Sequence, residues 1–491
     1  MSTPDPRDPS LSQSLIPVSV LIGLLATSVY LYGDGSSSGP NQIALILGAG
    51  VAILVGLWNG HRWKELEAGM VHGISLAMGA IMILLIVGSL IGTWILAGIV
   101  PTMIYYGLMV LTPSFFYAAA CVICAMVAVA TGSSWTTAST IGIALIGIAI
   151  AQNLNMGLAA GAIISGAYFG DKMSPLSDTT NLAPAMAGTD LFVHIRHMVW
   201  TTTPSLTIAL VLYAILGFTG APPRQTTELN TILDTLSQQF VIGPHLLLPA
   251  GLVIVLVVRK MPAFPALLIG ALTGGVFAVV FQQEAVLRFT DTATLPRSVA
   301  LLQGFWTAMF DGFTLTSGNA ALDDLLSRGG MASMLPTIWL IMSAMMFGAV
   351  METTKMLHRL AAGILSFVRG SGSLIAATLL TSFGMNVLAS DQYIAIVLPG
   401  RMFRAEYRKR GLKAKNLSRA LEDSGTLTSV LVPWNTCGAF MAQTLGVATL
   451  TYAPFCFFNI LNPLISALYG FTGFTIEKLP AAAQPDETAV A

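Results

Sequence analysis

The stretch GDKMSPLSDTTN, residues 170–181, places charged and hydroxyl side chains where the neighbouring sequence is apolar. It follows GLAAGAIISGAYFG, a run of small and apolar residues that is typical of a membrane interior. The carboxylates of Asp171 and Asp178 and the hydroxyls of Ser177 and Thr179 are oxygen donors, which small hard cations prefer as ligands. We therefore interpret this stretch as a candidate cation site.

The composition predicts a membrane protein. Of the 491 residues, 55% are hydrophobic and 9% are charged, and the mean hydropathy is +0.76. A soluble domain carries roughly a quarter charged residues. The long apolar runs suit helices, which need about 20 residues to span a bilayer, better than the alternating strands of a barrel. The predicted fold class is an all-α polytopic membrane protein, and the net charge of zero argues against a nucleic-acid partner.

The distribution of basic residues predicts the orientation. The segment 401–419 holds eight Lys and Arg residues against the single acid Glu406, so we expect it to be cytoplasmic. The segment 61–67 is also basic, whereas 33–41 contains no Lys or Arg. The first helix is then expected to run from inside to outside.

Polar and apolar segments divide the chain into five parts. We expect roughly 11–13 crossings plus two hairpins, on the span-length rule. Two apolar runs, 156–169 and 391–399, look too short to cross alone. The expected parts are a cytoplasmic N-terminal tail (1–14), a first membrane repeat (15–218) with a hairpin near 165–190, a polar connecting segment (219–245), a second membrane repeat (246–473) with a hairpin near 420–445, and a C-terminal tail (474–491).

The polar interruptions of the two halves correspond to one another. In the first half, GSSWTT at 132–137 precedes PLSDT at 175–179. In the second half, the segment SFGMNVLASDQYIAIVLPG at 382–400 precedes PWNTC at 433–437. Interrupted helices in corresponding places of two halves indicate the binding site of a secondary transporter.

Four carboxylates lie at or beside these breaks: Asp171, Asp178, Asp391 and Asp423. A charge near the bilayer centre costs at least ~2.5–3.5 kcal/mol, so such residues are usually functional. The alternative is that some of them cap helices at the membrane boundary, above all Asp423, which borders the basic segment.

The neighbours of Asp178 favour cation binding over capping. Ser177, Thr179 and Asn181 complete a compact cluster of oxygen donors around it. Lys172 is interpreted either as an internal cation that a substrate displaces or as an ion-pair partner that holds the hairpin with Asp171.

A carboxylate in such a site holds either a cation or a proton, and competition between the two is the simplest mechanism of antiport. Symport would need a second site, for example an arginine for the carboxylate of an organic substrate. The candidate is Arg401, which could equally be a topological anchor.

Two further patterns are interpreted as structural. HIRH at 194–197 lacks a third metal ligand nearby and is taken as the start of an interfacial helix. CVIC at 121–124 has redox spacing but lies in an apolar run, so inert core thiols are expected. Neither a P-loop nor a dinucleotide fingerprint occurs.

Three segments resemble the NhaC-type sodium/proton antiporter family, within the larger ion-transporter superfamily. They are SGAYFGDKMSPLSDTTNLAPAMAGTDLFVHIRHM (165–198), GSSW with STIGIALIGIA (132–149), and DQYIAIVLPGRMF with ALEDSGTLTSVLVPWNTCGAF (391–440). The match spans roughly residues 15–470. Thr136 stands where a common form of the first break has glycine.

The resemblance implies an inverted-repeat transporter of the bacterial inner membrane with broken helices and two re-entrant hairpins. By the resemblance, the hairpin tips carry Ser177, Asp178 and Thr179 in one half and Asn435 and Thr436 in the other. Asp178, Ser177 and Asn435 are the expected direct metal ligands, with Ser134 of the GSSW break in support.

The implied function is export of Na⁺ in exchange for H⁺ by alternating access. The expected partners are the substrates Na⁺ and H⁺ and membrane lipid; no cofactor is expected, and a homodimer is left open. The first alternative is a sodium-coupled exchanger of organic acids such as malate and lactate. A membrane enzyme or a channel is the third class, and no nucleophile–base pair in the sequence supports an enzyme.

Overall fold

A computed structural model describes residues 6–219, 226–290, 295–318, 322–323 and 326–480. Within these ranges all regular secondary-structure elements are helices, and the only β pairing is an isolated bridge between Leu412 and Lys478. The expected all-α class is confirmed.

The helices up to the polar connection are α1 (Leu11–Tyr32), α2 (Pro40–Trp58), α3 (Trp63–Leu76), α4 (Met78–Leu96), α5 (Ile99–Val110), α6 (Phe116–Thr131), α7 (Ser134–Thr137), α8 (Ile143–Ala151), α9 (Met156–Met173), α10 (Asp178–Ala187), α11 (Leu191–Thr219) and α12 (Thr226–Gln239). A wide π-helical turn, η3 (Ala138–Gly142), joins α7 to α8.

The helices that follow are α13 (Leu248–Val258), α14 (Ala263–Phe281), α15 (Gln283–Phe289), α16 (Arg297–Phe310), α18 (Leu335–Thr353), α19 (Met356–Leu365), α20 (Ser371–Leu388), α21 (Gln392–Lys409), α22 (Ala414–Leu421), α23 (Thr436–Leu445), α24 (Thr449–Tyr452) and α25 (Phe457–Thr472). A second π-helical turn, η6 (Glu422–Thr426), extends α22, and the short 3₁₀ helix η7 (Ser429–Leu431) follows it.

Nine helices of the described ranges are long and apolar enough to cross a membrane, or up to 11 if each of two bent pairs is one span. Only the higher number reaches the lower bound of the expected range. The two runs that looked too short belong to longer helices, α9 and α21, of 18 residues each. Polar and basic residues continue these helices beyond their apolar part, which hydropathy alone does not detect.

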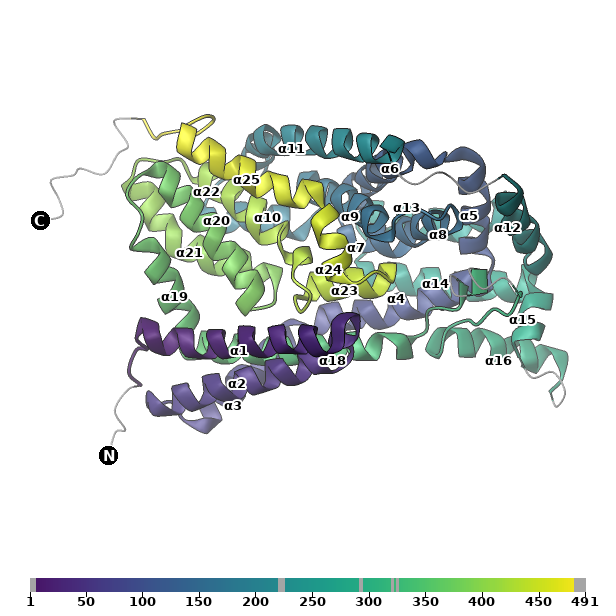
Figure 1. The fold of residues 1–491 in the computed structure, drawn as a ribbon, viewed down its shortest axis with the longest axis horizontal. Helices are drawn as coiled ribbons and strands as arrows, with labels where there is room; N and C mark the ends of the chain where they lie inside the picture. Colours follow the sequence, from purple (N-terminus) through teal and green to yellow (C-terminus); the bar gives the residue numbers. More distant parts are fainter. Residues whose placement is uncertain (1–5, 220–225, 291–294, 319–321, 324–325, 481–491) are drawn as a thin grey trace, which may run out of the picture.

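The broken helices lie in the middle of the molecule (Figure 1). α18 packs against α2 and α3 along the lower side of this view, and α11 packs against α25 along the upper side. Between these layers lie α7, α9, α10 and α23, which carry the predicted polar breaks. The fold thus places breaks from both halves near its centre.

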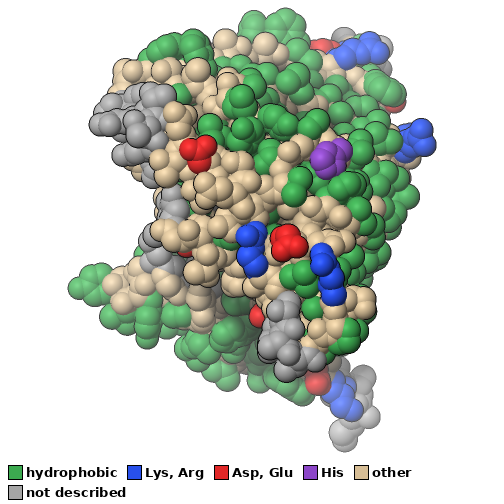
Figure 2. Space-filling view, turned by 90° about the vertical axis from the view of Figure 1, so that its right-hand side faces the viewer, with side chains coloured by type: hydrophobic (Ala, Val, Ile, Leu, Met, Phe, Trp, Pro, Cys, Tyr) green, Lys and Arg blue, Asp and Glu red, His purple; other side chains and the backbone are tan. Residues whose placement is uncertain are grey.

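The surface is largely apolar, as lipid contact requires. Large hydrophobic side chains are exposed along many helices, among them Ile22, Leu54, Val276 and Leu464. Figure 2 shows few charged side chains, scattered among hydrophobic and uncharged ones on one end of the molecule.

The basic segment expected to be cytoplasmic is mostly helical: it forms the second half of α21 and the start of α22. Glu477, which follows α25, pairs with Lys413 at 2.9 Å and with Lys415. The hydrogen bonds from Lys415 and Lys413 lower the pKa of Glu477 to about 2. These contacts attach the chain after α25 to the basic segment.

Close packing of α6 against α9 positions the first break. A Cβ atom on Gly166 would lie 2.0 Å from the carbonyl oxygen of Cys121, and one on Gly170 would lie 2.4 Å from Cβ of Ala128. Gly166 and Gly170 form the small-xxx-small spacing that lets membrane helices approach closely. Because Asp171 follows Gly170 directly, this contact also sets the position of its carboxylate.

We expect Gly170→Ala to destabilise the protein by about 1–3 kcal/mol, the usual range for overpacking. The added methyl would also lie 2.5 Å from the backbone nitrogen of Val129, which cannot rotate away. Thermal unfolding of the purified protein, followed by tryptophan fluorescence, measures the effect. The matched control is Gly384→Ala in α20, where a Cβ meets nothing within 4 Å. Equal melting temperatures for both variants would contradict the packing account.

Candidate functional site

Two breaks of the first half are joined by Asp171, in the last turn of α9. Its Oδ2 accepts hydrogen bonds from the backbone nitrogen of Ser134 at 3.1 Å and from Oγ of Ser134 at 2.6 Å. Gly132, with φ +70°, allows this approach, because a Cβ there would lie 2.6 Å from Cβ of Leu176. These hydrogen bonds therefore connect two predicted site residues, Asp171 and Ser134, and hold the end of α9 against the start of α7.

The break between α9 and α10 is held by its own side chains. Ser177 caps α10 and accepts a hydrogen bond from the backbone nitrogen of Thr180 at 3.4 Å. Asn181 donates to the carbonyl oxygens of Pro175 at 2.9 Å and Ser177 at 2.7 Å. Asn181, predicted to contact the cation, thus shapes the break from its exposed side.

In the second half, Asp391 caps α21. One carboxylate oxygen accepts hydrogen bonds from the backbone nitrogens of Tyr393 at 2.9 Å and Ile394 at 3.2 Å. The backbone nitrogen of Thr436 donates to the carbonyl oxygen of Ser390 at 3.0 Å, which ties α23 to this cap. We considered helix capping above all for Asp423, whereas in the structure Asp391 caps a helix.

Asn435 caps α23 and lies buried beside the site. Its Oδ1 accepts a hydrogen bond from the backbone nitrogen of Cys437 at 3.0 Å, and its Nδ2 donates to the carbonyl oxygen of Asn386 at 3.1 Å. Both ends of this amide therefore contact backbone groups, and the second lone pair of Oδ1 leaves the predicted role of Asn435 as a ligand as a prediction.

The breaks of both halves enclose one cavity of about 790 Å³, which we call the central cavity. Its walls include a basic residue, Lys260, and hydroxyls of the GSSWTT break such as Ser133 and Thr136. Six predicted site residues line it: Asp171, Ser177, Asp178 and Thr179 from the first half, and Asp391 and Thr436 from the second. The cavity therefore collects carboxylate and hydroxyl oxygens from segments more than 200 residues apart.

Asp423 and Lys172 lie deeper than the central cavity. Both side chains are fully buried and form an ion pair with each other. Lys172 also donates to Oδ1 of Asn462 at 3.3 Å, and Thr201 donates to Asp423 at 3.2 Å. The expectation that Lys172 pairs with Asp171 is therefore replaced by a contact between α9 and η6.

Glu422 is the residue that the sequence reading missed. It is fully buried, and its Oε1 accepts a hydrogen bond from Oγ1 of Thr179 at 3.0 Å. The signal was a second acid directly beside Asp423, followed by an uncharged segment, because intramembrane carboxylates are rare and usually functional.

Arg401 and the two histidines lie elsewhere. Arg401 is exposed on α21 and is not among the residues that line the central cavity. His194 and His197 lie near the start of α11, as expected, and both are buried; Nδ1 of His194 lies 2.9 Å from Oγ of Ser418.

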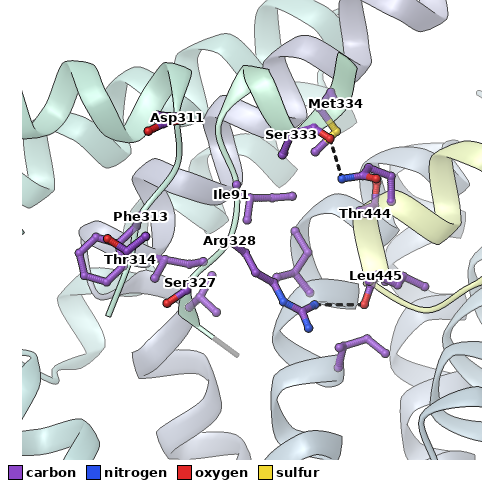
Figure 3. A pocket seen from close by; sticks show the side chains of 17 residues that line it. Ile91, Asp311, Phe313, Thr314, Ser327, Arg328, Ser333, Met334, Thr444 and Leu445 are labelled. Atoms are coloured by element: carbon purple, nitrogen blue, oxygen red, sulfur yellow. Dashed lines mark hydrogen bonds between the residues drawn. The ribbon is translucent and has the colours of Figure 1, made fainter. Parts of the chain in front are cut away.

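A second cavity of about 390 Å³ is lined by Ile143 and Ile146 of α8 and by the end of α23, whose first residue, Thr436, lines the central cavity. In Figure 3, Arg328 points toward the end of α23, where it donates to the carbonyl oxygen of Leu445 at 3.4 Å. Gln443, which also lines this cavity, donates to the carbonyl oxygen of Ser333 at 2.9 Å. Trp135, which lines the central cavity, stacks on Phe440 of α23 with ring centroids 4.0 Å apart.

Comparison with known proteins gives consistent matches along the chain. The sequence profile of the Na⁺/H⁺ antiporter family matches residues 166–474. The Na⁺/H⁺ antiporter NhaC of Alkalihalophilus pseudofirmus is 38% identical over 95% of this chain and 96% of its own length. NhaC of Bacillus subtilis is 39% identical over 88% and 92%. The malate-2H⁺/Na⁺-lactate antiporter of Bacillus subtilis is 36% identical over 96% of each chain.

We expect two substitutions of Asp391 to separate its cap from its charge. Asp391→Asn retains a capping oxygen and should melt like the native protein, whereas Asp391→Ala should lose about 1 kcal/mol. If the carboxylate also faces a bound cation, Asp391→Asn should weaken Na⁺ binding about tenfold, equivalent to ~1.4 kcal/mol. Thermal unfolding and titration calorimetry measure the two effects. If Asp391→Asn binds Na⁺ with native affinity, Asp391 acts only as a helix cap.

Proposed function

The chain belongs to the Na⁺/H⁺ antiporter family, and from this premise we propose that Na⁺ and H⁺ exchange in the central cavity. The protein is a multi-pass membrane antiporter that exchanges Na⁺ for H⁺. The main observation in support of this location is that Asp171, Asp178 and Asp391, from both halves of the chain, line one cavity.

Carboxylates that face one cavity repel each other, and a bound cation or proton relieves that repulsion. Ser177 and Thr436 add hydroxyl oxygens, the ligand type that hard cations prefer. Na⁺ and H⁺ then compete electrostatically for the negative charge of this region, so the arrival of one favours the departure of the other. This competition couples the two fluxes without a cofactor.

Alternating access would use the two cavities in turn. α7, η3 and α8 run beside α23 from the central cavity to the second cavity. In this proposal the stacked rings of Trp135 and Phe440, at the wall of the central cavity, would act as the barrier between them. Movement of these short helices would open one cavity while it closes the other, in the manner of inverted-repeat transporters.

The membrane potential can supply the energy for Na⁺ export. One elementary charge that crosses 100 mV is worth ~2.3 kcal/mol. Export is therefore driven if more protons enter than Na⁺ ions leave in each cycle.

The charge of the central cavity favours a cation over an organic acid as its occupant. Three carboxylates face it, against one basic side chain, Lys260. The arginine considered for an organic carboxylate, Arg401, is exposed on α21. The malate/lactate alternative would place a negatively charged carboxylate substrate among these acids, which would repel it.

We expect Na⁺ or Li⁺ to dissipate an imposed proton gradient in proteoliposomes that contain the purified protein and an internal pH dye. Asp178→Asn should abolish this response, because it removes the exposed charge of the cavity while it preserves the shape of the side chain. The control is Asp234→Asn on α12, an exposed acid outside the cavity.

Two results would contradict the proposal. Dissipation by malate or lactate but not by Na⁺ or Li⁺ would replace the function with organic-acid exchange. Native Na⁺-dependent flux in Asp178→Asn would remove Asp178 from the site.

A further inference from the structure

Glu422 lies behind the wall of the central cavity. Its side chain is fully buried, and Oε1 accepts the hydrogen bond from Thr179. Among the described residues, Oε2 has no hydrogen-bond partner. A buried carboxylate is stable when it is paired or when it carries a proton.

No basic side chain in the described part of the chain forms an ion pair with Glu422. Lys172 is the basic group whose charge acts on Glu422, and it forms its ion pair with Asp423 instead. Arg419 acts on Asp423 as well. The positive charges of this region are thus matched to Asp423, and one proton on Glu422 would complete the neutralisation.

Titratable groups reach this cluster from most of the helices around it, although α20, which also packs on η6, contributes none. They are Asp171 and Lys172 of α9, Asp178 of α10, His194 of α11, Tyr407 of α21, Arg419 of α22, Asp423 of η6 and Tyr469 of α25.

Two hydroxyl groups connect Glu422 to the central cavity. Oγ1 of Thr179 lies 3.0 Å from Oε1 of Glu422 and 3.2 Å from Oγ of Ser177. Ser177 and Thr179 both line the cavity. A hydroxyl donates one hydrogen bond while it accepts others, so this row can pass a proton.

We propose that Glu422 carries the exchanged proton and that the hydroxyls of Thr179 and Ser177 pass it to and from the central cavity. This inference rests on the proposed Na⁺/H⁺ exchange in that cavity. It assigns the proton and the Na⁺ to different groups: Na⁺ binds to oxygens that line the cavity, and the proton binds behind them.

The transfer balances in protons. When Oε1 of Glu422 carries the proton, the hydroxyl of Thr179 turns its own proton from Glu422 toward Ser177. Glu422 then gives its proton to Oγ1 of Thr179 as Thr179 gives its hydroxyl proton to Oγ of Ser177. Ser177 releases its proton to water in the cavity, so each hydroxyl keeps one proton and one proton leaves. Na⁺ in the cavity favours this release electrostatically, and its departure favours the reverse transfer.

Two fluxes in proteoliposomes separate proton carriage from Na⁺ binding. Counterflow of ²²Na⁺ at equal Na⁺ on both sides needs no proton, whereas the internal pH dye reports Na⁺/H⁺ exchange. Glu422→Gln stays neutral throughout the cycle. We expect it to retain ²²Na⁺ counterflow and to lose Na⁺-dependent proton flux.

The outcomes for Glu422→Gln are distinct. Native proton flux in this variant overturns the inference but leaves the proposed function intact. Loss of both fluxes in a folded variant would place Glu422 in the Na⁺ site and would also overturn it. Absence of Na⁺-dependent proton flux in the native protein would instead contradict the proposed function itself. Glu284→Gln, an exposed acid on α15, is the matched control.

The hydroxyl row is tested separately, which also covers a failure of Glu422→Gln to fold. Thr179→Val keeps the shape of the side chain but removes the proton link, so proton flux should fall by about two orders of magnitude, the lower range for proton-transfer groups. The ratio of proton flux to ²²Na⁺ counterflow should fall by the same factor, and Thr179→Ser should restore this ratio. Thr207→Val, in an exposed turn of α11, is the control. Equal proton flux in Thr179→Val and Thr207→Val would overturn the relay.

Discussion

The buried ion pair between Lys172 and Asp423 is the interaction on which the rest of the site depends. It joins the end of α9 in the first half to η6 in the second half, with both side chains fully buried. Removing one partner of such a pair costs about 3–5 kcal/mol, because the other charge is left unpaired in the interior. The pair therefore fixes the position of α9 relative to η6. Because Asp171 precedes Lys172 and Glu422 precedes Asp423, it also positions these two carboxylates.

Small residues and wide helical turns make this arrangement sterically feasible. The glycines of α9 let α6 approach closely, and Gly132 lets two breaks of the first half touch. η6 places Glu422 and Asp423 consecutively in the interior, where each meets a different partner: Thr179 for Glu422 and Lys172 for Asp423. π-helical turns of this kind often mark functional sites.

The sequence predicted the helical membrane fold and the polar breaks because both follow from local composition. It also predicted Asp171, Ser177, Asp178, Thr179, Asp391 and Thr436, which the structure brings to one cavity. It could not assign hydrogen-bond partners, since these depend on long-range packing: Lys172 meets an acid 251 positions away instead of its neighbour Asp171. Asn181 and Asn435 have the chemistry of ligands, yet the fold uses their amides to hold the backbone.

The central claim is that Na⁺ and H⁺ compete for the negative charge of one interior site shared by both halves. Proton release on Na⁺ binding tests it most directly, with purified protein in weakly buffered solution and a pH dye. The account predicts that NaCl releases protons, that an equal concentration of choline chloride does not, and that apparent Na⁺ affinity weakens as the pH falls. Calorimetric binding of Na⁺ with no proton release at any pH across the neutral range would contradict it.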